Sequence, residues 1–241
     1  MKELLAIDIG NSNVKYGLFL DGKLTQTWAH PTAATSISCA ETLKQSNAPV
    51  AIASVVPSVA AIIKNIVAER LVLELSSCKQ TVLSGMPAEM GADRVADAVA
   101  AWVLYGKSSK AVVVCSFGTA STALVVDGTG GVLGGWIMPG ITAQLEVMHE
   151  RCALLPLLHM DKPSLQLGVD TVTHMRNGVF VGNVGVAREW LSRASGQVCG
   201  SPVSVATGGW AGALQEHGRV FDHVDPLLTL KGISLIASAA F

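Results

Sequence analysis

Residues Leu4–Leu20 read LLAIDIGNSNVKYGLFL and combine two apolar runs around a short polar turn. The apolar run Leu4–Ile7 predicts a buried strand, and Val14–Leu20 predicts a second strand that returns beside it. The second strand closes at Asp21-Gly22, which is a hairpin signal. Asp8 then lies at the end of the first strand, directed toward whatever the polar turn binds.

The turn itself, Gly10 to Asn13, has the composition of a phosphate-binding loop. Gly10 allows a ligand to approach the backbone closely, and the turn's N–H groups suit an anion. Asn11, Ser12 and Asn13 add side-chain donors. Phosphates reach proteins together with a hard cation that prefers oxygen ligands, so Asp8 would hold Mg²⁺. An ordinary hairpin stabilised by Asx turns explains the same residues equally well.

Composition narrows the classes of protein. Of the 241 residues, 50% are hydrophobic and 15% are charged, so one large or two modest domains with a sizeable core are expected. The formal net charge of −1 and the lack of a basic run argue against nucleic-acid and membrane partners. The five scattered cysteines lack C-x-x-C spacing and predict reduced thiols in a cytoplasmic protein.

The remaining pattern predicts alternating strands and helices. We expect strands at Leu24–Trp28 and Val50–Val55, and strands or loops at Leu71–Leu75 and Gln80–Leu83. We expect helices at Cys39–Gln45, Ser58–Arg70, Asp93–Tyr105, Ile141–Ala153 and Thr171–Ala194.

The second half of the chain restarts the first. Val112–Ser121 is again an apolar strand that enters a polar turn, and Gly118 falls where Gly10 fell. Later, Val203–Gly209 mirrors Ala51–Pro57 as a strand followed by the start of a helix. Hairpin, strand and helix thus occur twice, which predicts an α/β fold of two copies of one unit facing a nucleotide cleft. We place the domains at 1–107 and 108–241.

The segment Thr171–Ala194 carries Gly178, Gly182 and Gly185. Each glycine costs about 1 kcal/mol against alanine inside a helix. A dimer contact would justify that cost. Close packing within the chain, or a break into two helices, explains the spacing equally well.

Taken together, the motifs resemble those of the type III pantothenate kinases, within the superfold of actin, sugar kinases and heat-shock ATPases. The resemblance runs in family order over nearly the whole chain. The matching residues are Asp8 to Asn13, Ser54 to Pro57, Gly91-Ala92-Asp93-Arg94, Gly118-Thr119-Ala120, Gly134-Gly135, Met138-Pro139-Gly140, Leu167-Gly168 with Thr171, Asn177-Gly178, Ala206-Thr207-Gly208-Gly209 and Asp225 to Gly232.

The resemblance implies two actin-like, ribonuclease-H-like halves and the phosphorylation of pantothenate by ATP, the first step of coenzyme A synthesis. It also implies a homodimer, Mg²⁺ and a monovalent cation, K⁺ or NH₄⁺. Asp93 would be the general base, and Gly91, Ala92, Arg94 and Thr171 would contact pantothenate, Thr171 across the dimer. ATP would lie against Asp8, Gly10, Asn11, Ser12 and Asn13 and against Gly118, Thr119, Ala120, Gly208 and Gly209.

Residue chemistry alone permits simpler roles for some of these residues. Asp93 follows a glycine at a helix start and suits an N-cap, worth about 1 kcal/mol. Arg94 suits a surface ion pair. Thr207-Gly208-Gly209 suits a tight strand-to-helix connection, and it also suits a helix N-terminus beside a nucleotide.

Three positions depart from the family pattern. Ser116 stands where the family has a metal-site aspartate, Leu124 where a further aspartate is frequent, and Ser84 where a tyrosine lines the pantothenate site. Loss of a carboxylate weakens a cation site at Asp8 and Ser116 without affecting the fold. A catalytically weak or inactive homologue that binds nucleotide as a regulator is therefore the alternative function.

Overall fold

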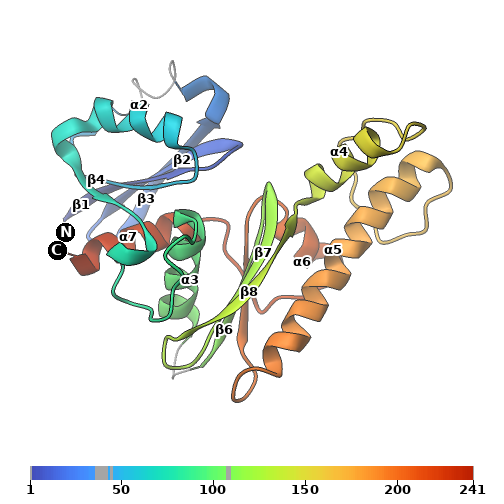
Figure 1. The fold of residues 1–241 in the computed structure, drawn as a ribbon. Coiled ribbons are helices and arrows are strands. Elements are labelled where there is room, and N and C mark those ends of the chain that lie inside the picture. The colour runs from blue at the N-terminus through green and yellow to red at the C-terminus, as the bar shows by residue number, and fades with distance from the viewer. Residues whose placement is uncertain (1, 36–42, 44–45, 107–109, 241) are drawn as a thin grey trace. The chain divides into compact units, whose positions relative to one another are not determined.

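The computed structural model describes residues 2–35, 43, 46–106 and 110–240, and Figure 1 shows their helices and strands. The chain forms two compact units. The first contains Met1–Leu104, Gly130–Val132 and Leu227–Phe241, and the second contains Tyr105–Thr129 and Leu133–Pro226, as far as these are described.

The first unit is built on a five-stranded sheet with the order β3-β2-β1-β4-β5. The strands are β1 (Glu3–Ile9), β2 (Asn13–Leu20), β3 (Lys23–Pro31), β4 (Val50–Ser54) and β5 (Leu71–Glu74). The first three form antiparallel pairs, and β4 and β5 add in parallel. The hairpin predicted from Leu4–Leu20 is confirmed, with Asp8 opposite Lys15.

Helices cover both faces of this sheet. Alternate residues of a strand point to opposite faces, and Ile7, Ile9 and Tyr16 pack with Ile63 of α2 (Pro57–Val67). The other face meets α7 (Leu228–Ala240), because a Cβ at Gly17 would lie 3.2 Å from Leu230. Helix α3 (Ala92–Tyr105) in turn packs directly on α7.

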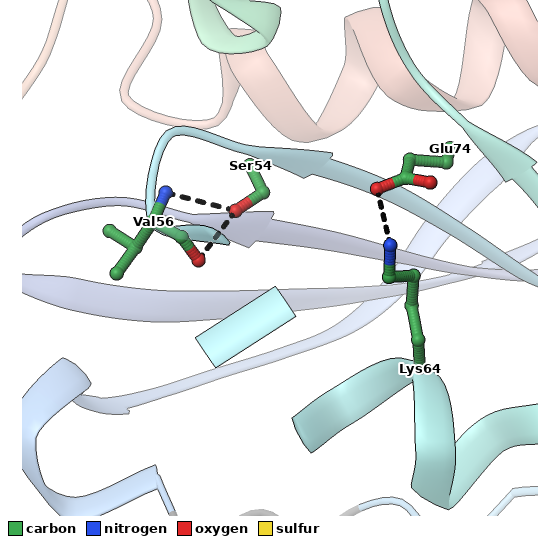
Figure 2. Close-up of polar contacts among 4 residues, drawn as sticks. All are labelled: Ser54, Val56, Lys64 and Glu74. Atoms are coloured by element: carbon green, nitrogen blue, oxygen red, sulfur yellow. Dashed lines mark hydrogen bonds and ion pairs between the residues drawn. The ribbon is translucent and has the colours of Figure 1, made fainter. Parts of the chain in front are cut away.

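Polar contacts fix α2 at both ends (Figure 2). The hydroxyl of Ser54 accepts from the N–H of Val56 at 3.0 Å and donates to the carbonyl of Val56 at 3.2 Å. Pro57 then opens the helix at a position that needs no N–H donor. An ion pair of 2.8 Å joins Lys64 of α2 to Glu74 of β5. Ser54 thus ends β4 and directs the chain into α2.

The second unit repeats the first. Its sheet order is β10-β9-β6-β7-β8, with β6 (Val112–Phe117), β7 (Ala120–Val126), β8 (Val132–Pro139), β9 (Val203–Thr207) and β10 (His223–Val224). Strands β6 and β7 form an antiparallel hairpin, and β9 adds to β6 in parallel, as β4 adds to β1. The duplication predicted from the sequence is therefore confirmed.

Three helices belong to the second unit: α4 (Ile141–Arg151), α5 (Thr171–Ser195) and α6 (Ala211–Gly218). Its core includes Phe117, Phe180 and Trp190. The rings of Phe117 and Trp190 stack with their centroids 6.3 Å apart. Helix α5 is continuous over 25 residues, which confirms the helix expected at Thr171–Ala194 and excludes the alternative of a break into two helices.

The structure also differs from the sequence predictions elsewhere. The helix expected at Ser58–Arg70 ends at Val67 and continues as the 3₁₀ turn Ala68–Arg70. Of the two alternatives given for Gln80–Leu83, the loop is found, and the side-chain oxygen of Gln80 accepts from the backbone N–H groups of Val82 and Leu83. Other 3₁₀ turns are Thr32–Ala34 and Ser77–Lys79. The helix expected at Cys39–Gln45 lies, apart from Leu43, outside the described residues.

The compact units differ from the predicted domains 1–107 and 108–241 in two segments of the chain. Helix α7 and residues Gly130–Val132 belong with the first unit, although they lie in the second half of the sequence. None of the helices in the described part of the chain is long and apolar enough to cross a bilayer.

Candidate active site

The first polar turn is held by its own backbone and by Thr32. The N–H of Gly10 donates to the carbonyl of Asn13 at 3.0 Å. The hydroxyl of Thr32 donates to the carbonyl of Gly10 at 2.7 Å, and the N–H of Thr32 donates to the carbonyl of Ser12 at 3.0 Å. Asn11, Ser12 and Asn13 are exposed. The turn is therefore preorganised with its polar groups in solvent, and Thr32 is a support that sequence analysis missed.

Asp8 is buried at the end of β1, beside this turn. Burial raises the pKa of the Asp8 carboxyl to about 7, the charge of Asp93 adds to the rise, and Lys15 opposes it. Lys15 is the cross-strand partner of Asp8, so both side chains lie on one face of the sheet. A carboxylate that is costly to charge in the protein alone is suited to a bound cation.

The segment Gly91–Arg94 lies next to the end of β1. The N–H of Val55 donates to the carbonyl of Ile9 at 3.1 Å, and a Cβ on Gly91 would lie 3.5 Å from Val55. That Cβ would also lie 2.7 Å from the Oδ1 of Asp93. Gly91 therefore leaves the space that the carboxylate of Asp93 occupies.

Asp93 lies inside the first turn of α3, because the helix begins at Ala92. Its Oδ1 accepts from the N–H of the next residue, Arg94, at 2.8 Å. The N-cap residue precedes the first helical residue, whereas Asp93 is the second residue of α3, so the N-cap interpretation of Asp93 is wrong. The carboxylate is half-buried and retains access to solvent.

Arg94 has a polar atom in need of an acceptor. Its Nε is buried and lacks a hydrogen-bond partner among the described residues. A buried donor left unpaired costs about 1–3 kcal/mol. An anionic or carbonyl oxygen of a substrate would satisfy it, so Arg94 fits a binding role better than the predicted surface ion pair.

Sequence analysis missed Asp97, one helical turn after Asp93. It is 4% exposed, and its Oδ1 accepts from the hydroxyl of Thr229 in α7 at 2.7 Å. Burial raises the pKa of Asp97 to about 8; the Thr229 hydrogen bond opposes the rise, while Asp93 and Asp8 add to it. The i, i+4 spacing of two acids on a helix was the available signal.

The second polar turn is shaped by three glycines of the second unit. The N–H of Gly118 donates to the carbonyl of Ala120, and the N–H of Gly140 donates to the carbonyl of Thr119, each at 3.0 Å. A side chain at Gly140 would clash with the carbonyl of Gly118. Gly208 has φ +91°, and a side chain there would clash with the carbonyl of Phe117.

The structure thus brings Gly118, Thr119 and Ala120 together with Gly208. The adjacent Gly209 is exposed, and helix α6 begins at Ala211. An exposed glycine thus precedes a short helix at this turn, which suits the approach of an anion.

Ser116 lies in a row of hydroxyl groups across the second sheet. It is paired in register with Thr122 of β7 and with Thr207 of β9, so the three side chains share one face. Thr122 and Thr207 are buried. These three residues offer neutral oxygen ligands where the family pattern implies an acid, and sequence analysis placed neither threonine beside Ser116.

Thr171 is the first residue of α5 and is exposed. Asp170 caps the helix by accepting from the N–H of Thr173 at 2.8 Å. A Cβ added at Gly178, Gly182 or Gly185 would have no described atom of the chain within 4 Å. Close packing within the described chain is therefore not the reason for these glycines.

Asp8 suits the Mg²⁺ that the family resemblance implies. Mg²⁺ usually binds proteins through one or two carboxylates, with water and substrate phosphate oxygens supplying the rest. Asp8 beside the first turn provides one such carboxylate. Within the described residues, neither a cluster of three His, Cys, Asp or Glu side chains nor a disulfide of Cys78, Cys115, Cys152 or Cys199 is present.

The family model for type III pantothenate kinases matches residues 4–193. A type III pantothenate kinase of Moorella thermoacetica is 32% identical over 251 residues, with 97% of this chain and 98% of the relative covered.

Solved structures show the same fold. A conserved protein of Campylobacter jejuni, assigned to the Baf family of transcriptional activators, matches with a TM-score of 0.63 and 20% identity, over 98% of each chain. An inorganic polyphosphate/ATP-glucomannokinase of an Arthrobacter strain matches with a TM-score of 0.52 and 16% identity, over 100% of each chain. These matches confirm the predicted α/β fold of two related halves.

Proposed function

Because this chain belongs to the type III pantothenate kinase family, we propose that it phosphorylates pantothenate with ATP to give 4′-phosphopantothenate, the first step of coenzyme A synthesis. One observation carries most weight beyond family membership. The backbone places Asp8, at the end of β1, near Asp93, at the start of α3: the N–H of Val55 donates to the carbonyl of Ile9, and Gly91 lies against Val55. A cation ligand and a base are thus available in one unit.

In this proposal Asp93 is the catalytic base. Its carboxylate takes the proton from the pantothenate hydroxyl as the hydroxyl oxygen bonds to the γ-phosphorus of ATP. The bond between that phosphorus and the β,γ-bridging oxygen breaks, and ADP leaves with the electron pair. General base catalysis contributes about 10²–10⁴-fold in rate, and the remainder comes from positioning and charge stabilisation.

The other residues bind substrates. Gly91, Ala92 and Arg94 contact pantothenate, and the unpaired Nε of Arg94 supports this role. The ATP phosphates bind the first turn, through Gly10, Asn11, Ser12 and Asn13, and the second turn, through Gly118, Thr119, Ala120, Gly208 and Gly209. Asp8 holds Mg²⁺, which neutralises phosphate charge when it is bound.

We further propose a homodimer in the cytoplasm that uses K⁺ or NH₄⁺. The open glycine face of α5 supports the dimer, in which Thr171 would reach the pantothenate of the partner. Ser116, with Thr122 and Thr207, supports a monovalent cation site of lowered charge, because hydroxyl oxygens replace the expected carboxylate.

The test is a coupled assay of ADP release by the purified protein with ATP, Mg²⁺ and pantothenate, repeated with K⁺, NH₄⁺ or neither. Pantothenate-dependent ADP release and 4′-phosphopantothenate in the product, identified by mass spectrometry, are expected. A folded protein that releases no ADP under any of these cations would contradict the proposal.

Ser116 also favours a second function, that of a nucleotide-binding regulator with weak or absent turnover. Calorimetric titration with ATP and Mg²⁺ separates the two. ATP binding without pantothenate turnover would support the regulator, whereas binding with turnover supports the kinase.

A further inference from the structure

Asp97 is a buried carboxyl that the proposed chemistry does not use. It is 4% exposed and lies four residues after Asp93, on the same side of α3. A buried ionisable group is costly, and a well-packed apolar side chain at such a position is often neutral or stabilising. Stability alone therefore gives a poor account of Asp97.

Its partner connects two helices. The hydroxyl of Thr229, the second residue of α7, donates to the Oδ1 of Asp97 at 2.7 Å. One turn further along α7, a side chain on Gly232 would clash with the carbonyl of Ala96. Helices α3 and α7 are thus held by one hydrogen bond and one backbone contact, both within about a turn of Asp93.

Helix α7 also contacts the strands that carry Asp8. A Cβ at Gly17 of β2 would lie 3.2 Å from Leu230, and Gly17 is paired with Ala6, two residues before Asp8. A continuous series of contacts therefore runs from Asp8 through the sheet to α7, and from α7 to the turn of α3 that follows Asp93.

We propose that Thr229 and Asp97 form a positioning pair that fixes the first turn of α3 and thereby aims the carboxylate of Asp93. The inference rests on the proposed function, because it assumes that Asp93 is the base. Neither residue touches substrate; both act through the orientation of the helix. A reacting group misplaced by about 1 Å can lose about 10²-fold in rate, so a single hydrogen bond can matter greatly here.

The test compares Thr229→Val, which keeps the side-chain shape and removes the donor, with Thr229→Ser, which keeps the donor. We expect Thr229→Val to lower kcat about tenfold or more, with the KM for ATP changed less than about twofold. Thr229→Ser should restore most of kcat. An unchanged kcat in Thr229→Val, or a Thr229→Ser variant as impaired as Thr229→Val, would overturn the proposal.

Tyr16→Phe is the matched control. It removes a buried hydrogen bond of 2.8 Å to His30 on the opposite face of the same sheet. We expect a comparable loss of thermal stability with kcat unchanged. An equal fall of kcat in Tyr16→Phe and Thr229→Val would reduce the effect to general destabilisation and overturn the positioning role.

Hydrogen exchange keeps the inference testable without turnover. Peptides covering residues 92–97 should exchange faster in Thr229→Val than in wild type, and as slowly as wild type in Thr229→Ser and Tyr16→Phe. If the wild-type protein turns over no pantothenate but the variants show this exchange pattern, the proposed function is contradicted and the positioning pair of Thr229 and Asp97 is still supported. Unchanged exchange in Thr229→Val would overturn the positioning pair itself.

Discussion

At the scale of single residues, the buried acids Asp8 and Asp97 make stability depend on pH. Burial raises their pKa values to about 7 and about 8, from the ordinary aspartate value of 3.8. An acid whose pKa is higher in the folded protein than in the unfolded chain favours folding most at pH values below the unfolded pKa. That contribution is lost as the pH rises through the folded pKa.

We therefore predict that the melting temperature falls between about pH 4 and pH 8, and that Asp97→Asn flattens part of this fall. Asparagine cannot ionise, and its side-chain oxygen can still accept from Thr229. Differential scanning fluorimetry across the range measures the effect. Glu89→Gln, at an exposed position, is the control and should keep the wild-type slope. A wild-type slope in Asp97→Asn would contradict the assigned burial effect.

Asp93→Asn should abolish phosphorylation while leaving the fold intact. Asparagine can still accept from the N–H of Arg94, but it cannot take a proton. A loss of about 10²-fold or more is expected from removing a general base. Steady-state kinetics measure it, with circular dichroism to verify folding. Near-normal turnover by the folded variant would rule out Asp93 as the base.

Ser116→Asp should strengthen activation by K⁺, seen as a lower half-saturating cation concentration at fixed ATP. The added carboxylate supplies an anionic oxygen beside the hydroxyls of Thr122 and Thr207. The control is Ser116→Thr, which changes the same position without adding a charge. Unchanged cation dependence in Ser116→Asp would mean that this position does not face the cation.

At the scale of elements, α5 presents three glycines to open space on one side. Because the described chain does not cover them, we predict that they form part of a dimer interface. Gly182→Leu should shift the protein toward monomer in sedimentation velocity at micromolar concentration. Gly212→Leu makes the same change at an equally open glycine of α6 and should not. A monomeric wild-type protein would contradict the interface.

The predicted elements succeeded where hydrophobic periodicity was strong. Strands β1, β2 and β4 and helices α3 and α5 lie within a few residues of their expected positions. Strand β8 was missed because glycine and proline disfavour strands. Gly135 is nevertheless required there, since a side chain would clash with the carbonyl of Ala123. Edge strand β8 is also largely exposed although most of its residues are apolar, so its sequence lacks the alternation of apolar and polar residues that marks a half-buried strand.

The candidate site was predicted as far as local motifs reach. The first turn, Gly91–Arg94 and the second turn each follow from a few adjacent residues. Thr32, Asp97 and Thr229 were missed because their roles depend on partners far away in the sequence, such as the pair of Asp97 with Thr229. Tertiary contacts of this kind leave no periodic pattern in a single chain.

At the scale of the whole molecule, the first unit needs the end of the chain. Helix α7 packs against Gly17 of β2 and against the backbone of Ala96 in α3. The second unit, by contrast, contains no residue beyond Pro226 among those assigned to it. Removing residues 227–241 should therefore affect the two units very differently.

We predict that a chain truncated after Pro226 loses the fold of its first unit and keeps that of its second. Limited proteolysis with mass spectrometry should digest residues 2–104 and leave a resistant fragment within residues 105–226. The full chain, treated in parallel, should protect both. Equal protection of residues 2–104 in the truncated chain would contradict the need for α7.

The position of α7 also sets the order of events during synthesis. Domains generally fold as they leave the ribosome, the N-terminal one first. Here the strands of the first sheet emerge early, but the helix that covers one of their faces is translated only after the second unit. The second unit can close while the first still exposes apolar surface. The nascent chain therefore depends on shielding, by chaperones or by the speed of translation itself, for the time needed to make more than half of the protein.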